Sequence, residues 1–287
     1  MMMTSILEVE HVQKTYKGST LGIKDVSFTI PNGSIVGFIG ENGAGKSTTM
    51  GTIIGTLRKD GGTIRIFGEE MDLNQVAFKE EIGVVFDTMQ LPGDLTVDKL
   101  GNVFQQLYKR WDQQAFSDYI DFFSLPQHKK IKGFSRGMSM KLSVSVALSH
   151  HARLLILDEA TAGLDPGGRD DVLAALREFV QDQKRGILLS SHITSDIEKI
   201  ADSLVFIKGG EVLLEVEKFA LLDHYGIVQC APDQYEQLEK SIVVAYRKTG
   251  EGFDVLVSNK RSIPSSMKPK HVSIDDITLL LMRGEKG

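Results

Sequence analysis

Hydrophobic residues recur along this chain with two periods, which together predict strands and helices. Alternating apolar positions predict strands near the N-terminus, at residues 6–16 and 24–30. Short apolar runs predict buried strands further along, at residues 35–39, 82–86, 154–157 and 187–189. Residues 204–208 and 211–216 flank two glycines and predict a hairpin. The pattern therefore predicts an α/β fold with a mixed sheet, in which antiparallel strands flank a core of buried strands.

From about residue 88 to residue 145 the apolar spacing becomes helical, which predicts an inserted helical subdomain. Pro92 and Pro126 interrupt the pattern and divide the segment. Many of its apolar residues are aromatic. Two interpretations of this aromatic face are open: it packs into the core of the subdomain, or it forms a groove for a partner protein.

A separate pattern begins after residue 217. Residues 242–246 and 253–257 predict strands, and residues 273–283 predict an amphipathic helix that a serine caps. We therefore expect one domain at residues 4–217 and a small accessory region at residues 218–287. That region is either an α/β extension or a mobile tail.

Composition narrows the classes of function. The chain has 287 residues and a net charge of −5, which disfavours a nucleic acid as main partner because phosphate backbones need a basic face. The single cysteine, Cys230, cannot form an intramolecular disulfide and fits a reducing compartment. No apolar run approaches the roughly 20 residues that span a bilayer, and the N-terminus does not read as a secretory signal. We expect a cytoplasmic protein that does any membrane work through a partner.

The strongest chemical signal is the stretch of residues 38–50, FIGENGAGKSTTM, which contains the P-loop pattern G-x-x-x-x-G-K-[ST]. Its glycines let successive backbone N–H groups point into one hollow, and a helix starting near Lys46 directs its positive end there. Lys46 supplies a mobile charge for the outer phosphates, and Ser47 supplies a hydroxyl for Mg²⁺. The stretch predicts a nucleotide-phosphate site formed by Gly40, Asn42, Gly43, Ala44, Gly45, Lys46, Ser47 and Thr48.

Polar residues end two of the predicted buried strands. Asp158 is expected to lie beside Ser47 and help to hold Mg²⁺. Glu159 is expected to accept a proton from the water that attacks the γ-phosphate. His192 ends another strand at the expected ligand edge, where a structural and a functional role are both open.

Two further residues have more than one interpretation. Tyr16 lies upstream of the P-loop, where it either stacks on an adenine ring or packs against its own strand. Ser135 precedes a predicted helix and, on local evidence, is simply its N-cap.

Taken in order, these motifs resemble those of the ATPase subunit of ABC transporters, over about residues 4–217. The P-loop, the helical insertion, Ser-x-Gly, Asp-Glu, Gly-Leu-Asp and Ser-His occur in the family's order. The chain is most similar to the stand-alone ATPase subunits of bacterial exporters. The resemblance implies a P-loop NTPase core with an N-terminal antiparallel β-subdomain, an inserted α-helical subdomain and a small C-terminal α/β extension. It implies ATP and Mg²⁺ as cofactors.

The same resemblance assigns roles to individual residues. Tyr16 is implied to stack on adenine, Glu159 to be the general base, and His192 to sense the γ-phosphate. Lys46 is implied to act on the phosphates during catalysis, and Asp158 to hold the metal. Ser135 and Gly137 are implied to belong to the signature motif, and Asp165 to the loop that communicates across a dimer.

The chain departs from the family pattern at two places. The signature reads Phe-Ser-Arg-Gly-Met at residues 134–138 and keeps the hydroxyl and the glycine. Arg136 within it either adds charge near a phosphate or points outward. Asp87 stands where the family carries the glutamine that approaches Mg²⁺, and we expect it to reach the metal through water. Gln90 is the alternative if the loop is shifted.

The resemblance implies a subunit that dimerises around two Mg·ATP molecules and powers transport, with export favoured, through a separate membrane permease. Its partners would be a second copy or a paralogous ATPase subunit and the permease, on the cytoplasmic face of the membrane. Two alternatives are a soluble ABC-type ATPase that is not coupled to transport and a nucleotide-sensing regulator. The single P-loop and the lack of a heptad run disfavour the first, and the intact Glu159 and His192 disfavour the second.

Overall fold

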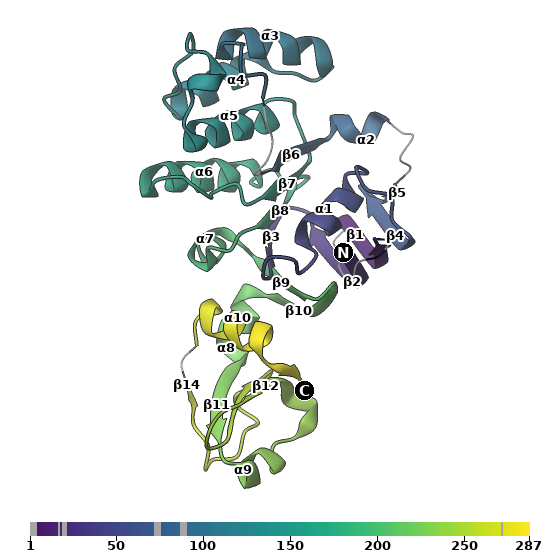
Figure 1. Ribbon diagram of the computed structural model, residues 1–287, viewed down its shortest axis with the longest axis vertical. Helices are drawn as coiled ribbons and strands as arrows, with labels where there is room; N and C mark the ends of the chain where they lie inside the picture. The colour runs from purple at the N-terminus through teal and green to yellow at the C-terminus, as the bar shows by residue number, and fades with distance from the viewer. Residues whose placement is uncertain (1–4, 17, 19–21, 72–75, 87–90, 271) are drawn as a thin grey trace.

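A computed structural model describes residues 5–16, 18, 22–71, 76–86, 91–270 and 272–287 (Figure 1). Asp87 and Gln90 lie outside these residues. Within the described ranges the chain forms a ten-stranded sheet, in the order β5-β4-β1-β2-β10-β9-β3-β8-β7-β6, and a five-stranded sheet, in the order β14-β11-β13-β12-β15.

The large sheet has an antiparallel part and a parallel part. β1 pairs antiparallel with β2 and β4, whereas β3, β6, β7, β8 and β9 pair parallel. This confirms the predicted mixed sheet. Its strands are β1 (Ser5–Thr15), β2 (Gly22–Pro31), β3 (Ser34–Ile39), β4 (Gly61–Ile66), β5 (Glu69–Glu70), β6 (Ile82–Phe86), β7 (Leu154–Asp158), β8 (Gly186–Ser190), β9 (Ser203–Lys208) and β10 (Glu211–Glu217).

The parallel part is buried on both faces. Along β7, Leu154 and Ile156 pack into the same apolar cluster as Met50 of α1 (Lys46–Ile53). Leu155 and Leu157 pack into the opposite cluster, with α5 (Arg136–Leu148), α6 (Pro166–Phe179) and α7 (Thr194–Ile200). Helices on both faces explain why these strands are continuous apolar runs rather than alternating ones.

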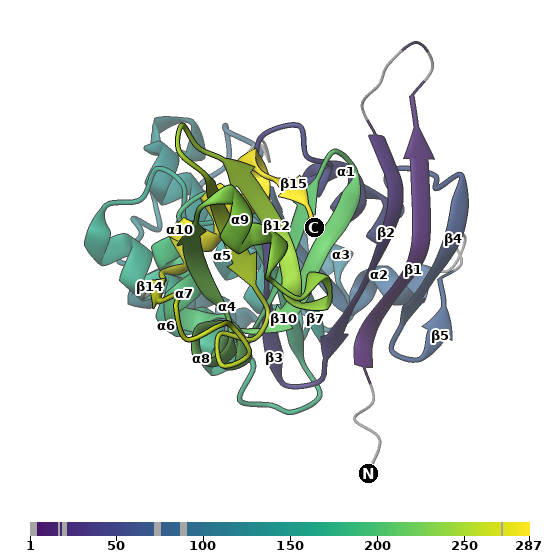
Figure 2. The same cartoon turned by 90° about the horizontal axis from the view of Figure 1, so that it is seen from below.

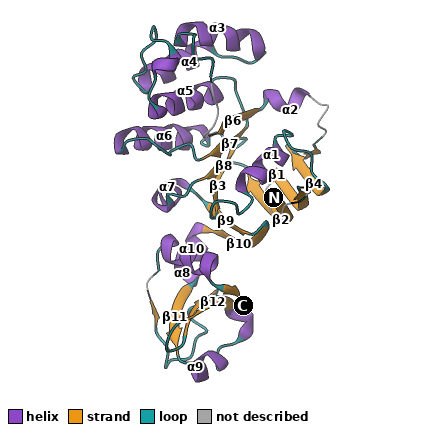
Figure 3. Cartoon of the chain, in the orientation of Figure 1, coloured by secondary structure: helices purple, strands orange, loops and turns teal. Residues whose placement is uncertain are grey.

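The helical insertion lies beyond the β6 end of the sheet (Figure 3). It contains α3 (Val97–Leu107), α4 (Gln113–Phe122), a 3₁₀ turn (Ile131–Gly133) and α5, and α2 (Val76–Glu80) precedes β6. Phe116 and Phe123 are buried, and the ring of Trp111 lies 5.1 Å from that of Phe116, centroid to centroid. Most of the aromatic face is therefore core, although Phe122 on the same helix is half exposed.

Residues 218–287, here called the C-terminal unit, form the five-stranded sheet and three α-helices, within the part of the chain that the structure describes. In chain order the elements are α8 (Lys218–His224), β11 (Gly226–Cys230), α9 (Pro232–Glu236), a 3₁₀ turn (Lys240–Ile242), β12 (Val243–Lys248), β13 (Phe253–Val257), β14 (Pro269–Lys270), α10 (Ile274–Arg283) and β15 (Glu285–Lys286).

α10 belongs to the C-terminal unit and packs against the ATPase part of the chain (Figures 1 and 2). Ser273 caps it, because its hydroxyl accepts a hydrogen bond from the backbone N–H of Asp276 at 3.1 Å. Leu280 and Ile277 belong to the same buried cluster as Ile197 of α7. The region is therefore a packed α/β extension rather than a mobile tail. Among the described helices, none is both long and apolar enough to cross a membrane.

Candidate active site

The P-loop joins the end of β3 to the start of α1, at the carboxyl edge of the parallel strands. Gly43 and Gly45 have φ angles of +81° and +110°, in the region that favours glycine. A Cβ on Gly40 would lie 2.5 Å from the carbonyl oxygen of Ile207, so no side chain fits there. α1 begins at Lys46, as predicted, and its free backbone N–H groups face back toward the loop.

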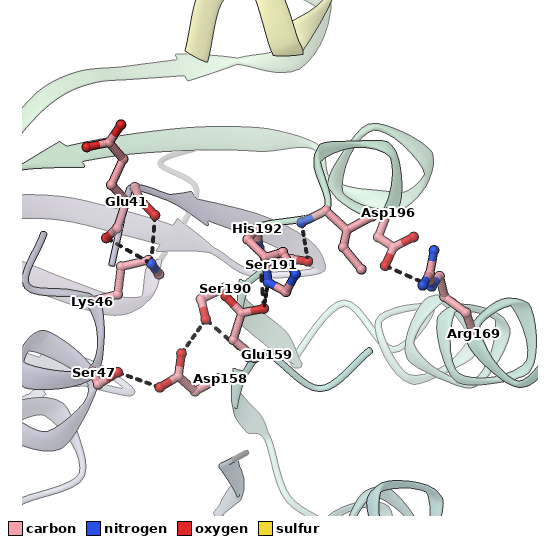
Figure 4. Close-up of polar contacts among 12 residues, drawn as sticks. Glu41, Lys46, Ser47, Asp158, Glu159, Arg169, Ser190, Ser191, His192 and Asp196 are labelled. Carbon is pink, nitrogen blue, oxygen red and sulfur yellow. Dashed lines mark hydrogen bonds and ion pairs between the residues drawn. The ribbon is translucent and has the colours of Figure 1, made fainter. Parts of the chain in front are cut away.

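Lys46 folds over the loop that carries it (Figure 4). Its Nζ donates hydrogen bonds to the carbonyl oxygens of Gly40 at 2.7 Å and Glu41 at 3.3 Å, and the side chain is buried. A buried ammonium needs such acceptors because removing its charge from water is costly. Phosphate oxygens are charged and therefore stronger acceptors for the same group. The geometry fits the predicted phosphate contact.

A hollow of about 270 Å³ adjoins the P-loop and is lined by the predicted phosphate-binding residues other than Gly40 and Ala44. Tyr16 lies at its rim with 38% of the residue exposed, and its hydroxyl lies 3.5 Å from Oγ1 of Thr48. An exposed ring beside the P-loop favours stacking on a base over packing within the strand. Ala44 is buried below the loop. Gly22 also lines the hollow and was not among the predicted site residues. The lining residues are Tyr16, Gly22, Asn42, Gly43, Gly45, Lys46, Ser47 and Thr48.

Asp158 connects the P-loop to the neighbouring strand end. Its Oδ2 accepts a hydrogen bond from Oγ of Ser47 at 2.6 Å, and its Oδ1 accepts one from Oγ of Ser190 at 2.5 Å. The serine hydroxyl and the carboxylate are oxygen ligands of the kind that Mg²⁺ prefers, so the pair fits that ion. Ser190 was not predicted to be a site residue. Its position at the end of a buried strand, two residues before His192, could have indicated such a role.

Glu159 and His192 are in direct contact across the ends of β7 and β8. Nδ1 of His192 lies 2.5 Å from Oε2 of Glu159, and the backbone N–H of His192 donates to the same oxygen at 3.3 Å. Glu159 has a φ of +57°, a left-handed conformation that costs a non-glycine residue about 1–3 kcal/mol. Such strain commonly persists at functional sites, because the surrounding structure fixes a side chain there in one direction.

The signature residues form a second group at the start of α5, a helix that lies apart from α1 in both views (Figures 1 and 2). Ser135 is the N-cap of α5, and its hydroxyl accepts a hydrogen bond from the backbone N–H of Met138 at 3.2 Å. Asp165 occupies the N-cap position of α6. The two helix starts pack together, since a Cβ on Gly137 would lie 3.3 Å from Leu164.

Arg136 lies against the loop between β7 and α6. A Cβ placed on Gly163 would lie 3.0 Å from its Cδ and 3.2 Å from its Nε. Gly163 has a φ of +78°, so the backbone conformation favours glycine there, and a larger residue would also have to displace the side chain of Arg136. The side chain of Arg136 therefore packs along the Gly-Leu-Asp loop and does not simply extend away from the protein.

Comparison with known proteins places these features in context. The sequence matches the ABC transporter family over residues 23–162. It is 32% identical over 217 residues to the bacitracin transport ATP-binding protein BcrA of Bacillus licheniformis, covering 75% of this chain and 70% of that protein. It is 27% identical over 273 residues to the ABC transporter ATP-binding protein YtrB of Bacillus subtilis, covering 92% of each. The fold is similar to a solved ATP-binding subunit of an ABC transporter, with a TM-score of 0.67 and 28% identity over 75% of this chain and 90% of that one.

Proposed function

This chain belongs to the ABC transporter family of ATP-binding proteins and is an ABC-type ATPase, and from that premise we propose that it hydrolyses Mg·ATP to drive a separate membrane permease. The observation that carries the proposal is the meeting of three strand ends. Ser47 from the P-loop, Asp158 and Glu159 from β7, and His192 after β8 lie in one connected set of hydrogen bonds.

Each residue of this set has a part in hydrolysis. Lys46 and the P-loop amides bind the outer phosphates. Ser47 and Asp158 would hold Mg²⁺, and the ion would supply positive charge that stabilises the phosphate oxygens. Glu159 accepts the proton of the attacking water through its carboxylate. His192 leaves Glu159 to bind the γ-phosphate and so reports whether that phosphate is present.

A second copy of the chain, or a paralogous subunit, completes each site. Ser135 and Gly137 lie at the start of α5, a 13-residue helix whose N-terminal N–H groups and positive dipole end attract anions. Because this group is separated from its own P-loop, we propose that it binds the γ-phosphate of the nucleotide held by the partner. Asp165, beside it, carries the state of one site to the other. Binding then closes the dimer and hydrolysis allows it to open.

The permease contact is assigned to the helical insertion. Val103 and Leu107 are spaced four apart on α3 and are 39% and 64% exposed, which gives this helix an apolar outer face. Docking there would place the subunit at the cytoplasmic face of the membrane. The chain is also 34% identical over 224 residues to the Nod factor export ATP-binding protein I of Sinorhizobium fredii, and this similarity supports export as the direction in this chain.

Replacement of Glu159 by glutamine tests the proposal. Turnover of ATP should fall by roughly 10²–10⁴-fold, the usual contribution of a general base, while nucleotide affinity stays unchanged. Gel filtration of the same variant with Mg·ATP should show a shift from monomer to dimer. Glu236→Gln, an exposed acid on α9, is the matched control and should behave as wild type. An unchanged turnover in Glu159→Gln would contradict the assigned role.

A further inference from the structure

A hydrogen bond links the C-terminal unit to the segment that carries His192. The hydroxyl of Thr194 donates to the carboxylate of Asp275. Thr194 is the first residue of α7 and lies two residues after His192, whereas Asp275 lies in the first turn of α10. The bond therefore joins residues 81 positions apart in the chain.

Asp275 is held in place by the packing of the helix that carries it. Leu280 and Leu281 of α10 are buried in the cluster that also contains Ile200 of α7. At the other end of α10, Nζ of Lys208 in β9 donates to the carbonyl oxygen of Gly284 at 2.8 Å. Both ends of α10 are thus attached to the ATPase part of the chain, which fixes the backbone that carries the exposed side chain of Asp275.

The short segment from residue 191 to residue 194 is held by three side-chain contacts. His192 contacts Glu159 at its start, and the buried Ser191 accepts a hydrogen bond from the backbone N–H of Ile193 at 3.0 Å. Thr194 is bound to Asp275 at its end. The P-loop and the ends of β7 and β8 together form what is here called the nucleotide edge of the large sheet. With both ends of the segment fixed, the nucleotide edge and the C-terminal unit jointly determine the direction in which the imidazole of His192 points.

We propose that Asp275 is a positioning residue for ATP hydrolysis, which acts through Thr194 on His192 and hence on Glu159. It touches neither nucleotide nor metal. Its function is to hold the start of α7 so that the imidazole lies within reach of Glu159 before ATP binds and of the γ-phosphate once ATP is bound. The C-terminal unit is then part of the hydrolytic machinery. The proposal rests on the proposed roles of Glu159 and His192.

Substitutions at Thr194 test the link with little change in shape. Thr194→Val removes the hydroxyl and keeps the volume, and we expect kcat to fall about 5-fold or more, the lower end of typical couplings between sites. KM for ATP should stay unchanged, because the P-loop and Tyr16 are unaffected. Thr194→Ser keeps the hydroxyl and should retain the wild-type rate. Ser195→Ala, at an exposed neighbouring hydroxyl, is the matched control and should change nothing.

A double-mutant cycle identifies the partner. If Asp275 acts through Thr194, then Asp275→Ala alone should lower kcat as Thr194→Val does, and the double variant should be no slower than either. Additive losses, or equal rates in Thr194→Val and Thr194→Ser, would overturn the proposal. Should Asp275→Ala fail to fold, the pair of Thr194 variants decides the outcome by itself.

Glu159→Gln measured in parallel separates this inference from the proposed function. If Glu159→Gln loses turnover while Thr194→Val and Asp275→Ala hydrolyse ATP as wild type does, only the positioning role is wrong. If Glu159→Gln hydrolyses ATP normally, the proposed function itself is wrong, and the positioning role falls with it.

Discussion

Charged side chains have different kinds of hydrogen-bond partner at the nucleotide edge of the large sheet and in the small sheet of the C-terminal unit. At the nucleotide edge, Lys46 is bound to backbone carbonyls and His192 to Glu159, and in the proposed function each of these contacts is exchanged for a phosphate oxygen. In the C-terminal unit the buried Asp254 accepts hydrogen bonds from Arg247 at 2.7 Å and Gln229 at 2.8 Å. That carboxylate is satisfied by permanent protein partners.

Backbone conformation differs in the same sense. The nucleotide edge contains Glu159 in the left-handed region and the P-loop glycines at positive φ. In residues 218–270 and 272–287 no non-glycine residue has a positive φ. Left-handed non-glycine residues therefore occur in the ATPase part of the described chain, at Glu159 and also at His11, Phe67, Ser124 and His151, whereas the described C-terminal unit has none. On the positioning role proposed for Asp275, a unit without left-handed non-glycine backbone serves the active site by fixing its surroundings.

A cavity in α10 should produce the largest change, because this helix belongs to both regions. Leu280 is 3% exposed, and Leu280→Ala should lower the free energy of unfolding by about 2–5 kcal/mol. Leu279→Ala, one residue away and 42% exposed, is the control and should cost far less. Urea denaturation followed by fluorescence and by circular dichroism measures both. If the regions share one core, the two probes should report a single transition. Separate transitions in the wild type would show that the C-terminal unit is energetically independent.

The parts of this site that depend on local order were predictable from the sequence. The P-loop is contiguous, so its glycines, the start of α1 and the position of Lys46 follow from a few neighbouring residues. The caps Ser135 and Ser273 were predictable for the same reason.

Contacts between distant residues were not predictable. Ser190 reaches Asp158 only because β8 and β7 are neighbours, and the pairing of Thr194 with Asp275 depends on how α10 docks on α7. Alternation of apolar and polar residues also cannot predict very short strands, because two residues, as in β14 and β15, are too few to show a period. The choice between a tail and a folded extension therefore needed the tertiary packing.

Removal of the P-loop charge should sharpen the contrast between exchangeable and permanent contacts. Lys46→Ala removes one charge-assisted hydrogen bond to phosphate, a loss of about 1.5–3 kcal/mol in the free energy of ATP binding. At an ATP concentration that stabilises the wild type by about 2.7 kcal/mol, the variant should gain only about 1.4 kcal/mol or less. Thermal unfolding with and without Mg·ATP measures this gain. Lys240→Ala, an exposed lysine of the C-terminal unit, should keep the full gain, and equal gains in both variants would contradict the phosphate contact.

The smallest predicted effect concerns acid stability and a buried histidine at the junction of the helical insertion with the sheet. His150 is 1% exposed, and its ring lies 4.3 Å from that of Tyr108, centroid to centroid. Its nitrogens lie 3.2 Å and 3.3 Å from the carbonyl oxygens of Val146 and Ile82. Burial lowers the pKa of His150, and the carbonyl contacts and the charge of Glu80 offset this only in part.

Because the folded protein resists protonating His150, the unfolded chain binds its proton first as the pH falls below the ordinary histidine value of about 6.5. Stability from this group is therefore complete above that pH and is lost below it, by at most about 1.4 kcal/mol per pH unit.

His150→Phe keeps the ring contact with Tyr108 and removes the titration, so its free energy of unfolding should fall less than that of the wild type between pH 7.5 and 5.5. Asp254 of the C-terminal unit should add nothing in this window. Burial raises its pKa, but the hydrogen bonds from Arg247 and Gln229 and the charge of Arg247 outweigh burial and lower the pKa below its ordinary acidic value. Equal pH dependence in His150→Phe and the wild type would show that His150 takes up its proton in the folded protein and that its burial does not control acid stability.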